Sequence, residues 1–192
     1  WDDTYNFIYN TNQDYIYKNF REGTNTLEDL DLDFFVYSNL EKKAIFSVYS
    51  NDILKKNRLD FENKILKEFE NNNINTIFKY KSNYLYLIKS EIRKSDSSGN
   101  TNGYIYSGKV ISNEYFKTLT KVFHNFYISL QSDSASNLKL NFSYLKNIKV
   151  KTIYTNSIIN NNIQIYDTNN NYVFSIVTQN ERDIVNNGQK TI

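Results

Sequence analysis

The 192-residue sequence contains no cysteine, no proline and no methionine, and His124 is its only histidine. Without cysteine the chain can form neither a disulfide framework nor a Cys-ligated zinc site, and thiol catalysis is excluded. A single histidine also removes most imidazole chemistry. Because methionine is absent even from position 1, we expect the chain to be a piece of a longer protein.

Long apolar runs and blocks of like charge are also missing. No stretch approaches the roughly 18 apolar residues that a membrane-spanning helix requires, and no signal-peptide pattern precedes Trp1. The net charge of +2 arises from interspersed basic and acidic residues. We therefore expect no nucleic-acid partner, because such proteins carry a clustered basic surface. The length and a hydrophobic content of 40% predict a single domain with a substantial core.

The most regular stretch predicts a long β-hairpin. Two runs rich in aromatic and β-branched residues, Tyr84–Arg93 and Gly103–Ile111, flank a Ser-, Asp-, Asn- and Gly-rich segment typical of a turn. Side chains alternate along a strand, so Tyr86 and Ser90 are expected on one face, shared with Tyr104 and Tyr106 of the partner strand. Both faces mix polar and apolar residues, which favours the centre of a sheet covered on both sides, with room for a ligand on one of them.

Hydrophobic periodicity predicts the remaining elements. Helices are expected at 1–20, with an interruption near 10–12, at 58–70 and from 113, and strands at 33–38, 44–49, 76–81, 126–131, 149–154, 162–166 and 172–178. Together they predict an α+β domain with a central antiparallel sheet, consisting of an entry helix at about 1–20, a core at about 33–178 and the start of an exit helix at about 179–192. Because both end helices look unfinished, we expect the two ends of the chain to leave the domain side by side.

Two aspartate patterns imitate a calcium loop. Asp29, Asp31 and Asp33 have the spacing that opens an EF-hand, but Phe34 takes the sixth position, where glycine is needed, and Leu40 takes the twelfth, where glutamate is needed. The second pattern begins at Asp167 and fails at the same two positions, so an Asx-type hairpin turn is expected there. His124 lacks a partner ligand in the sequence. We therefore expect no metal site and no cofactor.

The N-terminal acidic pair predicts a structural contact. Asp2 and Asp3 are neighbours on a helix, so their side chains point about 100° apart and cannot share one proton in acid/base catalysis. We expect Trp1 to pack on the sheet, while Asp2 or Asp3 holds a cation such as Arg182 and ties the entry helix to the exit helix.

The hairpin supplies the candidate ligand contacts. They are Tyr86, Ser90, Arg93, Tyr104, Tyr106 and Lys109. Phenols, a hydroxyl and cations at the strand ends are groups that recognise a small anionic or zwitterionic ligand. Packing in the core is the alternative interpretation of the tyrosines, since aromatic strand residues are usually buried.

Several stretches also match a family pattern. The start, Trp1-Asp2-Asp3-Thr4-Tyr5 with Tyr15 and Asn19, is one of them. The hairpin segment Ile92–Gly99 with Gly103, Gly108 and Lys109 is another, and Glu181–Ile184 with Gly188 is the last. In this order they resemble the fourth of the CHASE families, the cyclase- and histidine-kinase-associated sensory extracellular domains. The sequence departs from the family pattern at Lys109, where arginine is common, at Glu91, where proline is common, and at 39–42, where an Asp-x-x-Gly turn is usual.

The resemblance implies a PAS-like fold related to Cache domains. It further implies a domain held outside the membrane between two membrane-spanning helices, with a cytoplasmic histidine kinase or diguanylate cyclase as output, and it implies no particular ligand. We therefore expect a non-catalytic, ligand-sensing extracytoplasmic domain of a membrane receptor that passes a conformational change through its entry and exit helices. A homodimer along the entry helix is compatible with this hypothesis. The alternative is a secreted or surface-anchored adhesion or solute-binding module.

Overall fold

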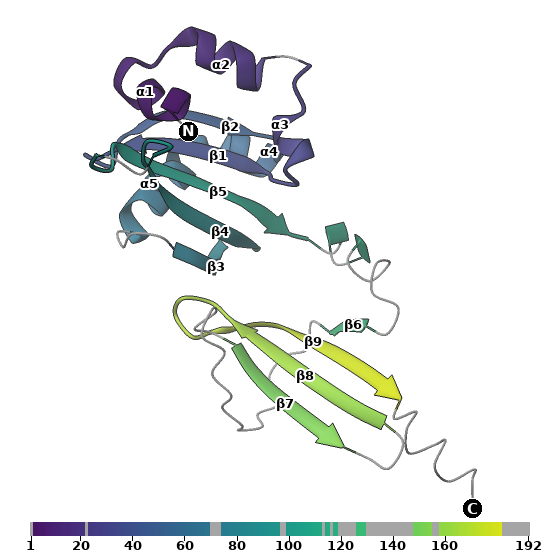
Figure 1. The fold of residues 1–192 in the computed structure, drawn as a ribbon. Coiled ribbons are helices and arrows are strands. Elements are labelled where there is room, and N and C mark those ends of the chain that lie inside the picture. Colours follow the sequence, from purple (N-terminus) through teal and green to yellow (C-terminus); the bar gives the residue numbers. More distant parts are fainter. Residues whose placement is uncertain are drawn as a thin grey trace, which may run out of the picture. The chain divides into compact units, whose positions relative to one another are not determined.

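The computed structural model describes residues 2–21, 23–69, 74–96, 99–112, 114–115, 117–118, 126–129, 148–154 and 158–181. The chain forms two compact units, Trp1–Thr76 with Tyr80–Val110 and Ile77–Lys79 with Ile111–Ile192. Its described strands form two separate sheets, one of five strands and one of four (Figure 1). Helices combined with antiparallel strands confirm the predicted α+β class. The single central sheet expected from the sequence is wrong, because the later strands pair only among themselves.

The five-stranded sheet contains the predicted hairpin. Its strands are β1 (Phe34–Asn39), β2 (Ala44–Tyr49), β3 (Ile74–Tyr80), β4 (Asn83–Ile92) and β5 (Gly103–Ile111), in the order β2-β1-β5-β4-β3. The hairpin strands β4 and β5 match the prediction, and β5 is the central strand. Gly108 is required where β4 and β5 approach each other, because a Cβ atom there would lie 2.0 Å from the Tyr86 carbonyl oxygen.

One face of this sheet is covered by the N-terminal helices. Helices α1 (Asp2–Asn10), α2 (Gln13–Phe20) and α3 (Thr26–Asp29) bring Phe7, Ile8 and Leu27 into a cluster with Phe35 and Tyr37 of β1. The Phe7 ring makes an edge contact with Tyr37, at 5.7 Å between ring centroids. This aromatic packing anchors α1 to the sheet.

The predicted long N-terminal helix is instead two short helices. Thr11 adopts a positive φ of 44°, which a continuing α-helix does not allow. Asn12 then caps α2, with its side-chain oxygen accepting the Asp14 N–H at 2.8 Å. The interruption falls at the predicted position, and it lets both helices pack on one face of the sheet.

The other face is covered by α4 (Asp52–Lys56) and α5 (Arg58–Glu68). The Phe61 ring lies 5.0 Å from the centroids of both Phe34 and Tyr80. Helix α4 was not predicted, although Asn51 is a strong signal for it, since its side chain accepts the N–H groups of Ile53 and Leu54.

A buried carboxylate ties α5 to β2. Glu62 is 5% exposed and accepts hydrogen bonds from Ser47 at 2.6 Å, Tyr49 at 3.1 Å and the Arg58 guanidinium at 2.8 Å. Burial and the neighbouring Glu62 carboxylate raise the pKa of Tyr49 above its ordinary range. The charge is thus paired and hydrogen-bonded, as a buried carboxylate must be.

The tight turn between β1 and β2 forms without the Asp and Gly of the family pattern. Lys42 has a φ of 60°, the conformation that glycine would supply. The Asn39 side chain accepts the Lys43 N–H at 3.0 Å, the role of the usual aspartate. Asn39 and Lys42 thus stand at the positions that Asp and Gly take in the common pattern, and here they form a tight turn.

The four-stranded sheet is an antiparallel arrangement of its own. Its strands are β6 (Phe126–Ser129), β7 (Ile148–Tyr154), β8 (Ile158–Tyr166) and β9 (Tyr172–Glu181), in the order β6-β9-β8-β7. The predicted Asx turn between β8 and β9 is confirmed, since Asp167 accepts the N–H groups of Asn169 and Asn171, each at 2.8 Å.

Two boundaries in this sheet differ from the prediction by three residues or more. Strand β8 starts at Ile158, earlier than expected, because Asn161 bonds to Thr152 at 2.8 Å and to Thr178 at 3.0 Å on the flanking strands. Strand β9 continues to Glu181, which pairs with Ile158, so residues 179–181 are strand and not the start of an exit helix. The rest of the expected exit helix lies outside the described residues. The expectation that the two chain ends leave side by side stays a prediction.

We expect Glu62→Ala to lower the free energy of unfolding by about 2–4 kcal/mol, because two hydroxyl groups and a guanidinium lose a buried acceptor. Glu62→Gln should cost less, since one oxygen acceptor remains. Glu68→Ala on the same helix is the control, because Glu68 pairs with Lys64 on the surface and should matter by less than about 0.5 kcal/mol. Urea denaturation measures all three, and equal losses at both glutamates would contradict the buried network.

Lys42→Gly should stabilise the protein by about 0.5–1 kcal/mol, because the relief of a positive φ exceeds the added chain entropy of glycine. Leu40→Gly in the same turn is the control, since Leu40 is exposed and is not among the residues with positive φ. We expect this control to destabilise. Thermal unfolding of both variants checks the sign, and stabilisation by Leu40→Gly as well would contradict the explanation.

Candidate functional site

Two adjoining hollows lie around α3, where β1 begins and β2 and β5 end. Their volumes are about 280 Å³ and about 220 Å³, and Leu27, Glu28 and Ser50 line both. We call this pair of hollows the α3 groove. All its lining residues belong to the first compact unit.

The polar half of the groove is built on the end of α3. The Asp31 and Leu32 N–H groups bond back to the Glu28 and Leu27 carbonyl oxygens at 3.0 Å and 2.8 Å, which is the Schellman arrangement of a helix end. Asp31 occupies the left-handed position of this motif, with a φ of 53°, where glycine is usual. The motif fixes Asp31 so that it meets Lys109 of β5.

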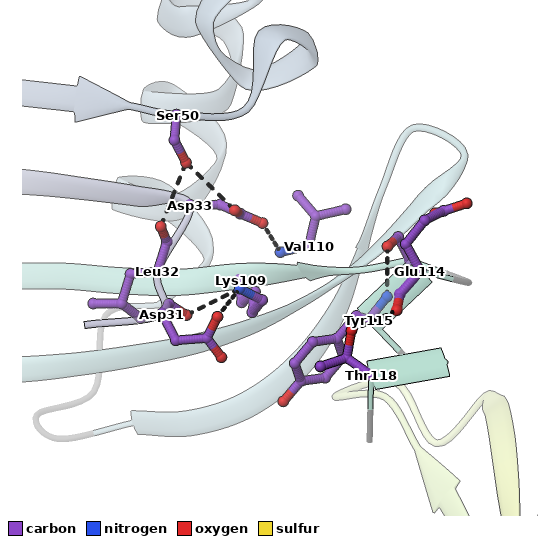
Figure 2. Close-up of polar contacts among 10 residues, drawn as sticks. Asp31, Leu32, Asp33, Ser50, Lys109, Val110, Glu114, Tyr115 and Thr118 are labelled. Carbon is purple, nitrogen blue, oxygen red and sulfur yellow. Dashed lines mark hydrogen bonds and ion pairs between the residues drawn. The ribbon is translucent and has the colours of Figure 1, made fainter. Parts of the chain in front are cut away.

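Lys109 is held by two groups of Asp31. Its Nζ donates to the Asp31 carboxylate and, at 3.2 Å, to the Asp31 carbonyl oxygen. Figure 2 shows the Lys109 side chain directed at Asp31. The Lys109 side chain is 20% exposed and that of Asp31 is 74% exposed, so the pair lies at the groove's mouth.

Asp33 connects the start of β1 to the end of β5. One carboxylate oxygen accepts the Val110 N–H at 2.7 Å and the other accepts the Ser50 hydroxyl at 3.4 Å (Figure 2). The Asp33 N–H in turn donates to the Gly108 carbonyl oxygen at 2.8 Å. The C-terminal residues of β5 are therefore hydrogen-bonded directly to a groove residue.

The two halves of the groove differ in character. One half is lined by Phe20, Val48 and Tyr49 together with the uncharged polar residues Thr24, Asn25 and Thr26, while Asp31, Asp33 and Lys109 line the other. With Glu28, the groove carries three carboxylates and one ammonium group. Within the described part of the chain no group of three or more His, Asp or Glu side chains could hold a metal ion.

The predicted ligand contacts are only partly brought together. Lys109 lines the α3 groove, but Tyr104 and Tyr106 share a face with Lys89, whose Nζ lies 4.1 Å and 5.5 Å from their ring centroids. Since side chains alternate along β4, Tyr86 and Ser90 lie on the opposite face from Lys89.

The predicted common face is therefore wrong. The long connection between Ile92 and Gly103 does not set the register of the hairpin, and a shift of one residue moves every side chain to the other face. The role of Tyr86 or Ser90 in ligand binding stays a prediction, with no shared pocket to support it.

The buried environment of Lys89 was missed by the sequence analysis. Lys89 is 3% exposed and donates to the Phe69 carbonyl oxygen at the end of α5, at 2.9 Å. Burial raises the pKa of the neighbouring Tyr106 to about 12. A lysine that directly follows the apolar run Tyr84–Ile88 within a strand is an uncommon pattern that could have indicated such a contact.

Arg93 lies at the tip of the hairpin and not in the α3 groove. Its guanidinium forms an ion pair with Glu91 at 2.6 Å. The hydrogen bonds from Arg93 and Thr101 hold the pKa of the Glu91 carboxyl below its ordinary value. This pair, with Arg93 exposed and Glu91 partly buried, lies where the loop between β4 and β5 begins.

Asp2 also contacts the hairpin tip. Its carboxylate accepts the Ser95 N–H at 2.7 Å, and this bond holds its pKa below the ordinary value. Asn102 fixes the same helix by donating to the Tyr5 carbonyl oxygen at 2.6 Å. The stabilising contribution of the Asp2 bond is thus present above the unfolded-state pKa and is lost as the pH falls through the folded-state pKa.

The expected contact of Asp2 or Asp3 with Arg182 stays a prediction. Trp1 and Arg182 lie outside the described residues, and Asp3 is exposed on α1. The observed partner of Asp2 is Ser95. The entry helix is therefore tied to the hairpin within its own unit.

In the sequence, Asp31 and Asp33 stand out only as part of an incomplete EF-hand calcium loop. Their shared feature is a position between a short helix and a strand that is buried at every residue from Phe34 to Ser38. Acidic side chains that directly precede such a strand lie at the edge of the core, where few polar partners exist. That context was the available signal for this site.

We expect Asp33→Ala to speed amide hydrogen exchange at Val110 by about tenfold or more, because the acceptor of that N–H is lost. Asp33→Asn should show a smaller effect, since its side-chain oxygen still accepts. Exchange at Tyr37, in the centre of the sheet, serves as the internal reference. Equal acceleration at both amides would indicate global destabilisation and contradict a local anchor.

Of the helices that the structure describes, none combines the length and the apolar character needed to cross a membrane. A search of curated proteins finds no match to the chain. The family model of the CHASE4 domain matches residues 1–131, which includes all residues of the α3 groove. CHASE4 domains are sensory, extracellular-type domains of signalling receptors and not catalytic domains. The suspected resemblance is thus confirmed, and the chain belongs to the CHASE4 domain family.

Proposed function

We propose that this chain is the ligand-sensing, extracytoplasmic input domain of a transmembrane receptor. Its output would be a histidine kinase or a diguanylate cyclase, to which the chain passes a conformational change. Membership of a sensory family supports this proposal. The same membership favours sensing over the alternative of an adhesion or solute-binding module.

The observation that carries the proposal is the contact between the α3 groove and the end of β5. Lys109 and Val110 bond to Asp31 and Asp33, and Val110 is the last residue of the first compact unit. A ligand in the groove competes for these same polar groups. Binding would therefore alter the segment through which the chain leaves the unit.

The same strand begins beside the entry helix. A Cβ atom at Gly103, the first residue of β5, would lie 3.2 Å from the Ile8 side chain of α1. Strand β5 thus touches α1 at one end and the groove at the other. For signalling, the ligand must bind two arrangements of this strand unequally, because equal affinity shifts no population.

The test is a stability screen of the whole 192-residue chain. The probes are the twenty common amino acids and the straight-chain carboxylates and amines of two to six carbons. We expect at least one of them to raise the melting temperature, since a ligand at a hundredfold excess over its Kd stabilises by about 2.7 kcal/mol. Calorimetry then measures its stoichiometry.

Two matched variants locate the binding. Glu28 and Asp29 are neighbours on α3 and both exposed, but only Glu28 lines the groove. Glu28→Trp should fill the groove and abolish the stabilisation, whereas Asp29→Trp should leave it intact. Stabilisation that survives Glu28→Trp, or a screen without any stabilising compound, would contradict the proposal.

A further inference from the structure

We infer that the α3 groove takes a small organic cation, with an ammonium group at the acidic half and a short apolar tail at the other half. This inference rests on the proposed function and names the ligand class of the same site. It differs from the anionic or zwitterionic ligand expected from the sequence. The argument comes from the two hollows, their charges and the contacts of Lys109.

The two hollows of the groove have part of their lining in common. Leu27, Glu28 and Ser50 line both hollows, so the two adjoin, and the inferred ligand would extend from one into the other. Phe20, Val48 and Tyr49 surround one end and can pack against a short hydrocarbon chain. This end therefore suits a short hydrocarbon tail, although Glu28 also lines it.

The charges at the other end favour a cation. The residues that line this end include three carboxylates, those of Glu28, Asp31 and Asp33, and one ammonium group, that of Lys109. The excess of two negative charges attracts an ammonium group and repels a carboxylate or a phosphate. An anion would also have to compete with Asp31 for Lys109.

Lys109 already shows the contact that a ligand ammonium would make. Its Nζ is bound by the carboxylate and the carbonyl oxygen of Asp31, both of which are acceptors for a primary amine. The Asp31 side chain is 74% exposed, so a second ammonium group can reach it from solvent. Lys109 thus acts as an internal competitor for a cationic ligand.

The test compares two molecules that differ in the charge of the head. Hexylamine and hexanoate are titrated into the whole chain by calorimetry at pH 7 and low salt, since salt screens such contacts. We expect hexylamine to bind saturably, with a Kd at least tenfold below that of hexanoate. Tighter binding of hexanoate, equal binding of the two, or no saturable binding of hexylamine would overturn the inference.

Three variants sharpen the result. Asp31→Asn, which tolerates the positive φ, should weaken hexylamine binding about tenfold through the loss of a charge-assisted hydrogen bond. Asp29→Asn makes the same change of charge outside the groove and should alter the Kd less than twofold. Lys109→Gln should tighten hexylamine binding severalfold by removing the competitor.

The direction in which Lys109→Gln changes the Kd of each molecule separates the cationic ligand from the more general proposal of a sensory groove. Hexanoate binding that is lost on Lys109→Gln would overturn the cationic ligand and still support a sensory groove. If neither molecule binds, the cationic ligand is rejected, while the proposed function is judged by the wider screen and Glu28→Trp. Weakening of hexylamine binding by Asp29→Asn as strong as that by Asp31→Asn would likewise reject the groove contact.

Discussion

The burial of β1 at consecutive positions is the constraint on which the first unit depends. Every residue from Phe34 to Ser38 is buried, although side chains alternate between the two faces of a strand. Such a strand is stable only if both faces are covered. Helices α1 and α2 therefore pack on Phe35 and Tyr37, while α5 packs on Phe34. The groove lies where this doubly covered strand begins.

The position of β5 explains why a site at this edge suits a sensor. It is the central strand of the sheet, it starts beside α1, and Lys109 and Val110 lie near its end at Ile111. Strands and helix ends hold the groove residues more firmly than a free loop would. Asp33 bonds to both β5 and the residue that follows β2. A small change at the groove is thus applied directly to the backbone of the central strand.

Because the sequence contains only five glycines, residues of other types take positive φ angles at several turns. Five residues other than glycine have positive φ in the described part of the chain, and they are Thr11, Asp31, Lys42, Lys81 and Asn170. Side chains in this conformation cost about 1–2 kcal/mol each. At Asp31 the residue brings a carboxylate to Lys109, which glycine could not do. At the other four positions, residues other than glycine adopt the positive φ that the backbone requires.

The sequence alone determined the local elements and the class of the fold. The bounds of β2 and β5, the break near Thr11 and the Asx turn at Asp167 follow from spacing, capping and turn residues, which act over a few positions. The tertiary structure alone decided the hairpin register that separates Ser90 from Tyr104, and the division of the strands into two sheets. It also decided the meeting of Asp31 with Lys109, which are 78 positions apart. Contacts of this kind depend on the packing of whole elements, and no local pattern of residues encodes which distant side chains that packing brings together.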